Sequence, residues 1–180
     1  MRTGCGLPKC DHDLRPMEAR TANELPRGPE WQYEPKWDGF RCLAFKDGTA
    51  AELRGKSGKN LTRYFPEVAT SLGAISLNRA LLDCEILILI DGELAFDALQ
   101  MRLHPAESRV RSLAEATPAT LTVFDTLMDT KGRPAYELSF EHRRNELEKL
   151  ASKISNAACL TPMTRDLRLA ENWLKIGFGG

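Results

Sequence analysis

The sequence predicts an α+β fold in which antiparallel β-strands come first and helices are interspersed among the later strands. Two short strand-like segments, residues 40–45 and 51–53, flank Asp47-Gly48, a pair typical of the turn in a β-hairpin. A Leu- and Ile-rich run over residues 80–90 predicts a buried strand, and residues 139–154 carry apolar side chains at helical spacing. Strands and helices do not alternate in a regular βαβ repeat, so a doubly wound fold is not expected.

The rest of the chain supplies shorter elements. Residues 1–30 are rich in Pro, Gly and charge and predict an irregular lead-in, followed by a short strand at residues 31–33. Gln100 and Arg102 fall on the solvent side of one predicted helix, and Asp166 is the expected N-cap of the last helix. The remaining expected elements are a strand at residues 121–124 and helices at residues 66–72, 94–103 and 166–177.

Charge is balanced over the whole chain, with 25 Lys plus Arg against 25 Asp plus Glu among 180 residues. A global excess of positive charge therefore does not announce a nucleic-acid partner, and only a local patch can do so. For the charge alone, an ordinary solvated basic face is the simpler interpretation. The patch lies between residues 36 and 63 and contains Lys36, Arg41, Lys46, Arg54, Lys56, Lys59 and Arg63.

The cysteines and the apolar runs indicate the cellular compartment of the protein and whether it enters a membrane. Five scattered cysteines, with no apolar secretion signal at the N-terminus, predict a reduced, cytoplasmic protein. Cys5, Cys10 and His12 lack a fourth ligand and the spacing of tetrahedral sites, so zinc is not expected. The longest apolar run, residues 86–90, is too short to cross a bilayer, so no membrane partner is expected.

Residues 34–41 read Glu-Pro-Lys-Trp-Asp-Gly-Phe-Arg, and the neighbours of Lys36 in this run suit a lysine that acts as a nucleophile. A lysine attacks phosphorus only as the free amine, which requires desolvation or neighbouring cations. Asp38-Gly39 predicts a tight turn after Lys36, and Arg41 lies five positions along, within reach of the same pocket. For Lys-x-Asp-Gly alone, a hairpin turn with a surface lysine is the simpler interpretation.

The full run resembles the Lys-x-Asp-Gly-x-Arg signature of the covalent nucleotidyltransferases, which comprise ATP-dependent DNA ligases, RNA ligases and mRNA capping enzymes. Its Glu-Pro-Lys-x-Asp-Gly form is most similar to the bacterial ATP-dependent DNA ligases. The resemblance begins near Arg15 and implies an α+β nucleotidyltransferase (adenylation) domain, ATP-grasp-like in its sheets. Three later segments resemble further family motifs in the same order: Gly-Lys-Ser-Gly-Lys-Asn-Leu-Thr at 55–62, Leu-Asp-Cys-Glu-Ile at 82–86 and Val-Phe-Asp-Thr-Leu at 123–127.

The resemblance implies a role for each matching residue. Lys36 would attack the α-phosphate of ATP and carry AMP on its nitrogen. Glu34 would accept a hydrogen bond from the adenine amine, which favours ATP over GTP. Arg41 would hold the ribose and phosphate side of the nucleotide, and Phe124 would stack on the base. By residue type alone, a Phe in an apolar strand is more often part of the core.

Two further residues follow from the same motifs. Glu85 would bind the ribose hydroxyl or help to place Mg²⁺, which neutralises charge on the phosphates. A carboxylate inside an apolar strand needs a partner, which supports a role for Glu85. Lys56 would bind phosphate at the rim of the site. We expect Lys36, Glu34, Arg41, Glu85 and Phe124 to converge on one pocket.

The sequence also departs from the family pattern. Lys56 stands where the family usually has Arg, so a bidentate phosphate contact becomes a point charge. Cys84 replaces a Gly, and strain follows if that position needs a positive φ. The family's later Glu/Asp-Gly-x-x-x-Lys and lysine motifs and its oligonucleotide-binding barrel do not appear in the 180 residues. We therefore expect an N-terminal part of the adenylation domain that seals nicks poorly by itself.

These observations predict an ATP-dependent DNA ligase that forms lysine-AMP at Lys36 and seals nicks in duplex DNA during repair, recombination or replication. ATP, Mg²⁺ and nicked duplex DNA are the expected cofactors and partners, with end-joining or repair proteins as further candidates. Two alternatives remain open: an RNA ligase with the same lysine chemistry, and a catalytically incomplete remnant that binds nucleotide or DNA.

Overall fold

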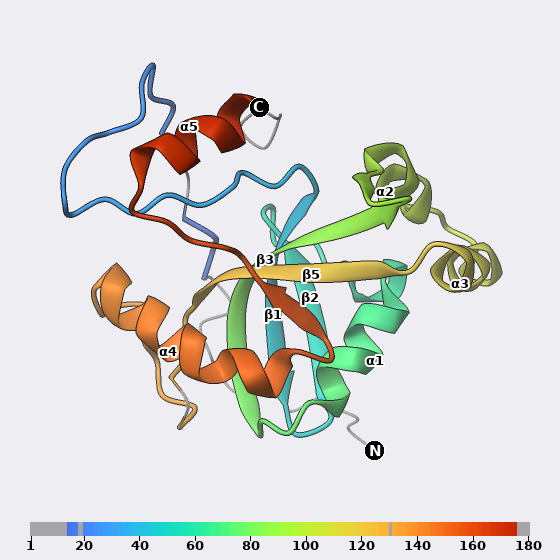
Figure 1. Cartoon of the computed structure of the whole chain (residues 1–180). Coiled ribbons are helices and arrows are strands. Elements are labelled where there is room, and N and C mark those ends of the chain that lie inside the picture. The colour runs from blue at the N-terminus through green and yellow to red at the C-terminus, as the bar shows by residue number, and fades with distance from the viewer. Residues whose placement is uncertain (1–13, 18–19, 130, 176–180) are drawn as a thin grey trace. The chain divides into compact units, whose positions relative to one another are not determined.

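The computed structural model of the chain describes residues 14–17, 20–129 and 131–175 (Figure 1). These residues divide into two compact units. The first, which we call the sheet unit, contains residues 14–16 and Gly39–Leu160. The second, which we call the flanking unit, is formed by described residues of the segments Met17–Asp38 and Thr161–Gly180. Each unit is described separately.

The sheet unit is built on one sheet with the strand order β2-β1-β3-β5-β6, and β4 pairs with β3 off this path. All pairs are antiparallel except β5 with β6. That one pair is parallel because α4 carries the chain back across the sheet before β6, a connection that a hairpin cannot make. The strands are β1 (Phe40–Asp47), β2 (Ala50–Gly55), β3 (Arg79–Ile90), β4 (Glu93–Leu94), β5 (Ala119–Thr126) and β6 (Ala158–Leu160).

The strands predicted in the sheet unit are confirmed, with longer bounds. The hairpin at Asp47-Gly48 joins β1 to β2, and Gly48 adopts the positive φ of 57° that favours glycine there. The expected strand at residues 80–90 is β3, and the one at residues 121–124 is the centre of β5. The sequence did not predict β6, because its three residues are too few to show a period.

One face of the sheet forms the main core. Side chains of alternate residues on the central strands point to this face, as the period of two requires. Helices α1 and α4 pack against it, α1 over β1, β2 and β5, and α4 over β5 and β6. The core includes Cys42, Ala44, Leu53, Val68, Leu72, Leu82, Cys84, Ile86, Leu121, Val123, Leu147, Leu150 and Ile154.

The helices of the sheet unit are α1 (Pro66–Ala74), α2 (Phe96–Arg102), α3 (Glu107–Ala116) and α4 (Phe140–Ile154), with a short 3-10 turn η1 (Thr62–Tyr64). The predicted helices agree with α1, α2 and α4. Ser139 caps α4 by accepting a hydrogen bond from the His142 N–H at 3.3 Å. Helix α3 was not predicted, since it buries only Val110 and Ala114 and so shows little apolar period.

Arg102 corrects the expectation that it lies on the surface of its helix. Its side chain is fully buried, whereas Gln100 is exposed as expected. The guanidinium donates to both carboxylate oxygens of Glu67, at 2.6 and 2.7 Å, and to the carbonyl oxygens of Tyr64 and Thr117. The buried charge is stable there because almost all of its donors are satisfied.

The flanking unit joins two segments that lie far apart in sequence. Tyr33 and Thr164 exchange backbone hydrogen bonds of 2.8 and 2.9 Å, and the expected strand at residues 31–33 is reduced to this single bridge. Helix α5 (Leu167–Lys175) follows, and Asp166 caps it as predicted by accepting from the Arg168 N–H at 2.8 Å. The predicted end at Gly177 lies outside the described residues. Among the helices described in either unit, none is long and apolar enough to cross a membrane.

Candidate active site

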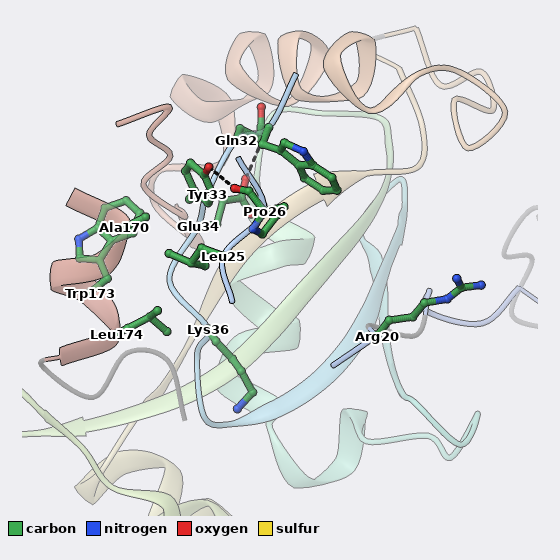
Figure 2. Close-up of a pocket in the computed structure, with 11 residues that line it drawn as sticks. Arg20, Leu25, Pro26, Gln32, Tyr33, Glu34, Lys36, Ala170, Trp173 and Leu174 are labelled. Carbon is green, nitrogen blue, oxygen red and sulfur yellow. Dashed lines mark hydrogen bonds between the residues drawn. The ribbon is translucent and has the colours of Figure 1, made fainter. Parts of the chain in front are cut away.

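A pocket of about 490 Å³ opens within the flanking unit, and both Glu34 and Lys36 line it. Its walls are mostly apolar and combine residues that precede the lysine with residues of α5. Figure 2 shows the Lys36 side chain extended away from Tyr33 and Gln32, so its amine is not held by either of them. The lining residues are Arg20, Leu25, Pro26, Trp31, Gln32, Tyr33, Glu34, Lys36, Ala170, Trp173 and Leu174.

Hydrogen bonds fix the segment that carries Glu34 and Lys36. The Tyr33 hydroxyl donates to the carbonyl oxygen of Pro26 at 2.5 Å, and the Gln32 amide donates to Glu34 Oε1 at 3.2 Å (Figure 2). Trp37 Nε1 donates to Thr161 Oγ1 at 2.9 Å, which ties the chain just after the lysine. Lys36 is therefore anchored on both sides in sequence, an arrangement that limits how far its backbone can shift.

In the sheet unit, Arg41, Asp83, Glu85 and Phe124 gather on the face of the sheet opposite the main core. Arg41 and Glu85 are directly paired across β1 and β3. Arg41 donates from Nε to Asp83 Oδ1 at 3.1 Å and from Nη2 to Oδ2 at 2.9 Å. Its guanidinium also lies over the Phe124 ring, 5.1 Å from the centroid. The result is a cation that makes two hydrogen bonds to a carboxylate and a cation–π contact with an aromatic ring.

Burial and charge act together on this group. Burial lowers the pKa of Arg41, but the hydrogen bonds and charge of Asp83, with a contribution from Glu85, raise it above its usual value. Burial raises the pKa of Asp83, and the Arg41 guanidinium opposes that rise without cancelling it. The Arg41 side chain therefore stays cationic, and it is 29% exposed, so an anionic or hydroxyl-bearing ligand can reach it from solvent.

Asp83 is the residue of this group that sequence reasoning missed. The motif comparison singled out Glu85 and left Asp83 without a role. Strand alternation could have found it, because residues 83 and 85 share one face of β3 and face β1 together. The bidentate contact makes Asp83 the residue that orients Arg41.

Lys56 lies elsewhere in the sheet unit, on the exposed turn between β2 and η1. Nearby, the Lys59 amine and the Arg63 guanidinium both make cation–π contacts with the Tyr64 ring, at 5.6 and 5.1 Å from its centroid. Arg54, in contrast, is engaged by Glu52 at 2.5 Å. We call Lys56, Lys59 and Arg63 the basic cluster.

Two expectations about the motif residues need correction. The chain only bends at Gly39 and does not form the expected tight turn. Gly39 is needed for close approach, since a Cβ there would overlap the Ile86 carbonyl oxygen and lie 2.7 Å from Leu87 Cδ2. Cys84 has no positive φ, so the strain considered for it does not arise. Its side chain is buried opposite Cys42, and burial together with Cys42 raises the pKa of its thiol.

The structure thus places the predicted residues in three groups. Glu34 and Lys36 share the pocket of the flanking unit, Arg41, Glu85 and Phe124 share one face of the sheet unit, and Lys56 belongs to the basic cluster. Convergence of the first two groups on one nucleotide remains a prediction.

Metal binding was expected only through Glu85. Within residues 14–17, 20–129 and 131–175, no group of three or more His, Cys, Asp or Glu side chains is placed to hold a metal ion. Mg²⁺ commonly binds through one or two carboxylates and the phosphates of its substrate, so a single carboxylate such as Glu85 fits that mode. Cys5, Cys10 and His12 lie outside the described residues.

Comparison with known proteins agrees with the motifs. Residues 16–175 match the family described as ATP dependent DNA ligase domain. The chain is 43% identical over 164 residues to DNA ligase C2 of Mycolicibacterium smegmatis and 42% identical over 168 residues to DNA ligase C of Mycobacterium tuberculosis. Each alignment covers 89% of this chain but only 44% and 45% of the relatives, so the chain spans less than half of their length.

A solved structure shows the same fold. Mycobacterial DNA ligase D, complexed with ATP and MES, aligns with a TM-score of 0.60 at 24% sequence identity. That alignment covers 79% of this chain and 45% of the other. Because the family match extends over nearly the whole described sequence and the relatives exceed 40% identity, the chain belongs to the ATP-dependent DNA ligase domain family.

Proposed function

We propose that this chain provides the lysine nucleophile and the adenosine-binding residues of an ATP-dependent DNA ligase that seals nicks in duplex DNA. One observation carries the proposal: Lys36 and Glu34 line the same largely apolar pocket. An apolar wall suits a nucleobase, a carboxylate can read its amine, and a lysine beside them suits attack on phosphorus.

The chemistry begins with the neutral amine of Lys36. Its nitrogen bonds to the α-phosphorus of ATP and loses a proton, while the bond from that phosphorus to the bridging oxygen of the β-phosphate breaks. Pyrophosphate leaves with the electron pair and AMP stays on the lysine. The 5′-phosphate at a nick then displaces the lysine nitrogen, and the 3′-hydroxyl displaces AMP to close the backbone.

The residues of the sheet unit supply the contacts to the rest of the nucleotide. Phe124 stacks on the base, Glu85 accepts from the ribose hydroxyls, and Arg41 neutralises charge on the phosphate side. Asp83 holds Arg41 in place through its two hydrogen bonds. Mg²⁺, bound by the phosphates with help from Glu85, would supply further neutralisation of the negative charge.

Several features favour duplex DNA and a cytoplasmic setting. The similar proteins named above are DNA ligases, whereas an RNA ligase would share only the lysine chemistry. Cys42, Cys84 and Cys159 are free thiols, which suits a reducing compartment. Nick repair is therefore the role that we propose, and competition between nicked DNA and nicked RNA separates it from the RNA-ligase alternative.

The decisive experiment is transfer of label from ATP, labelled at the α-phosphate, onto the full chain. We expect label on the wild type and none on Lys36→Ala, because no other group replaces the nucleophile. Lys175→Ala, an exposed lysine at the end of α5, is the matched control and should take label normally. Glu34→Gln should narrow the preference for ATP over GTP.

Two results would contradict the proposal. Label that persists on Lys36→Ala would show that another residue is the nucleophile. A wild-type chain that binds ATP without taking label would instead favour a nucleotide-binding role without catalysis.

A further inference from the structure

Strand β5 contains an irregularity at Phe124, where its pairing with β3 shifts by one residue. Val123 pairs with Cys84 and Asp125 pairs with Asp83, so one extra residue, Phe124, is inserted between two consecutive pairs. In a regular strand, neighbours alternate between the two faces, and Phe124 and Asp125 would point in opposite directions. Val123 points into the main core, so Phe124 points to the opposite face, where it contacts Arg41. The bulge lets Asp125 pair with Asp83 in the register.

The bulge brings two carboxylates, those of Asp83 and Asp125, into paired positions. Asp83 and Asp125 are paired in the register of β3 and β5, and both side chains are buried. Two carboxylates in that position repel each other, and both would compete for Arg41. Asp125 contributes to raising the pKa of Asp83, after burial as the main cause. A second cation is therefore required to hold Asp125.

Arg143, from α4, supplies that cation. Its Nε donates to both Asp125 oxygens at 3.0 Å, and its Nη2 donates to Oδ2 at 2.8 Å. Its Nη1 donates to the Leu138 carbonyl oxygen at 2.6 Å. Both side chains of the ion pair are less than 10% exposed. A cation in the first turns of a helix opposes the helix dipole, so Asp125 must offset that cost.

The four charges form a chain in which each carboxylate has its own arginine: Arg41 with Asp83, and Asp125 with Arg143. Removing Arg143 would leave Asp125 buried without its partner, close to Asp83 and Arg41. The strand could then relieve the charge by shifting at the bulge or by drawing Arg41 away from Asp83. Either change would move Phe124 or Arg41, the two residues that form the cation–π contact.

We propose that Arg143 is a positioning residue for nucleotide binding: through Asp125 it fixes the Phe124 bulge and leaves Asp83 free to orient Arg41. This inference rests on the proposed function, since it assumes that Arg41 and Phe124 contact the nucleotide. Arg143 itself does not contact the reacting atoms in this assignment.

The test compares Arg143→Gln with Arg144→Gln in the full chain. Arg144 is the next residue of the same helix, is also buried, and pairs with Glu148 instead of Asp125. The first measurement is the ATP concentration that gives half-maximal labelling of Lys36, recorded separately from the maximal labelled fraction. Loss of a charged hydrogen-bonded partner should raise that concentration about tenfold in Arg143→Gln. A merely structural role would lower the labelled fraction and leave the half-saturating concentration unchanged.

A second measurement does not depend on nucleotide. Amide hydrogen exchange at Phe124 and Asp125 should be faster in Arg143→Gln than in wild type or Arg144→Gln, because the bulge loses its anchor. If Arg143→Gln does not fold, Asp125→Asn, which keeps the shape of the side chain, carries both measurements. Arg143→Lys, which keeps the charge but not the forked contact, should be intermediate.

The outcomes separate the two proposals. Equal exchange and equal half-saturation in the Arg143 and Arg144 variants would overturn the positioning role. A wild-type chain that takes no label would defeat the proposed function, while the exchange data would still decide whether Arg143 anchors the bulge.

Discussion

Arg41 and Asp83 lie diagonally across β1 and β3, and the guanidinium donates to both carboxylate oxygens, at 3.1 and 2.9 Å. The carboxylate is almost fully buried, whereas the Arg41 side chain remains 29% exposed. Asp83 is therefore fixed within the sheet, whereas the Arg41 side chain reaches solvent. This asymmetry suits a residue that must present its charge to a ligand at a constant place.

Asp83→Asn tests that arrangement. The amide keeps one acceptor but loses the charge and the second acceptor, so Arg41 should lose its bidentate contact. We expect the ATP concentration for half-maximal labelling of Lys36 to rise roughly tenfold, from the loss of about 1.5 kcal/mol in a charged hydrogen bond. Asp97→Asn, at an exposed position in the first turn of α2, is the control. Unchanged half-saturation in Asp83→Asn would mean that Arg41 needs no such support.

Arg102, unlike Asp83, should affect the free energy of unfolding and not nucleotide binding. It is fully buried, and its removal would leave Glu67, whose side chain is only 21% exposed, without its ion-pair partner. We expect Arg102→Ala to lower the free energy of unfolding by about 3 kcal/mol or more, measured by urea denaturation. Arg111→Ala removes an exposed pair with Glu107 and should cost less than about 1 kcal/mol. Similar losses in the two variants would show that the buried pair contributes little.

Local features of the fold could be predicted from the sequence, whereas the tertiary partners of Arg102 could not. Hairpin chemistry at Asp47-Gly48 and the apolar run of β3 are local signals, and the structure confirms both. Arg102 could not be placed from its own helix, because its partners Glu67, Tyr64 and Thr117 come from other parts of the chain. A charged side chain is assigned to solvent unless the tertiary structure supplies those partners.

The candidate site divides in the same way. The resemblance to the family motifs predicts site roles for Lys36, Arg41, Glu85 and Phe124, and those roles stay predictions. The bulge at Phe124 and the support from Arg143 depend on the pairing of β5 with β3 and on where α4 begins. A shift of one residue in register leaves no local trace in the sequence, so only the structure could show it.

The lowered pKa of Asp129 predicts how the stability of the fold depends on pH. Burial pushes its pKa upward, but the N–H groups of Arg133 and Lys131 and the Arg133 guanidinium together lower it. A carboxyl with a lower pKa when folded than when unfolded contributes stability above its unfolded pKa, about 3.9, and loses it as pH falls further. We therefore expect Asp129→Asn to be less stable than wild type at neutral pH. The difference in free energy of unfolding should shrink below about pH 4. A difference that is the same at pH 7 and pH 3 would contradict this assignment.

The basic cluster should bind DNA phosphates. Lys56 is exposed on its turn, and the Lys59 and Arg63 side chains lie over the Tyr64 ring. Each phosphate contact releases counterions, so binding weakens steeply with salt, and removing one contact lowers the salt slope by about one. We expect Lys56→Ala to weaken binding of the chain to nicked duplex DNA and to reduce that slope. The measurement is a titration at several salt concentrations.

Lys153→Ala is the matched control for that titration, because it removes the same charge from an exposed position in the last turn of α4. A loss of affinity that is equal in the two variants would reflect net charge alone, since long-range attraction depends on total charge more than on position. A loss confined to Lys56→Ala would require a phosphate at the β2–η1 turn. If Lys56→Ala left both the affinity and the salt slope unchanged, the turn would have no part in DNA binding, and the phosphate contacts would have to come from other basic residues.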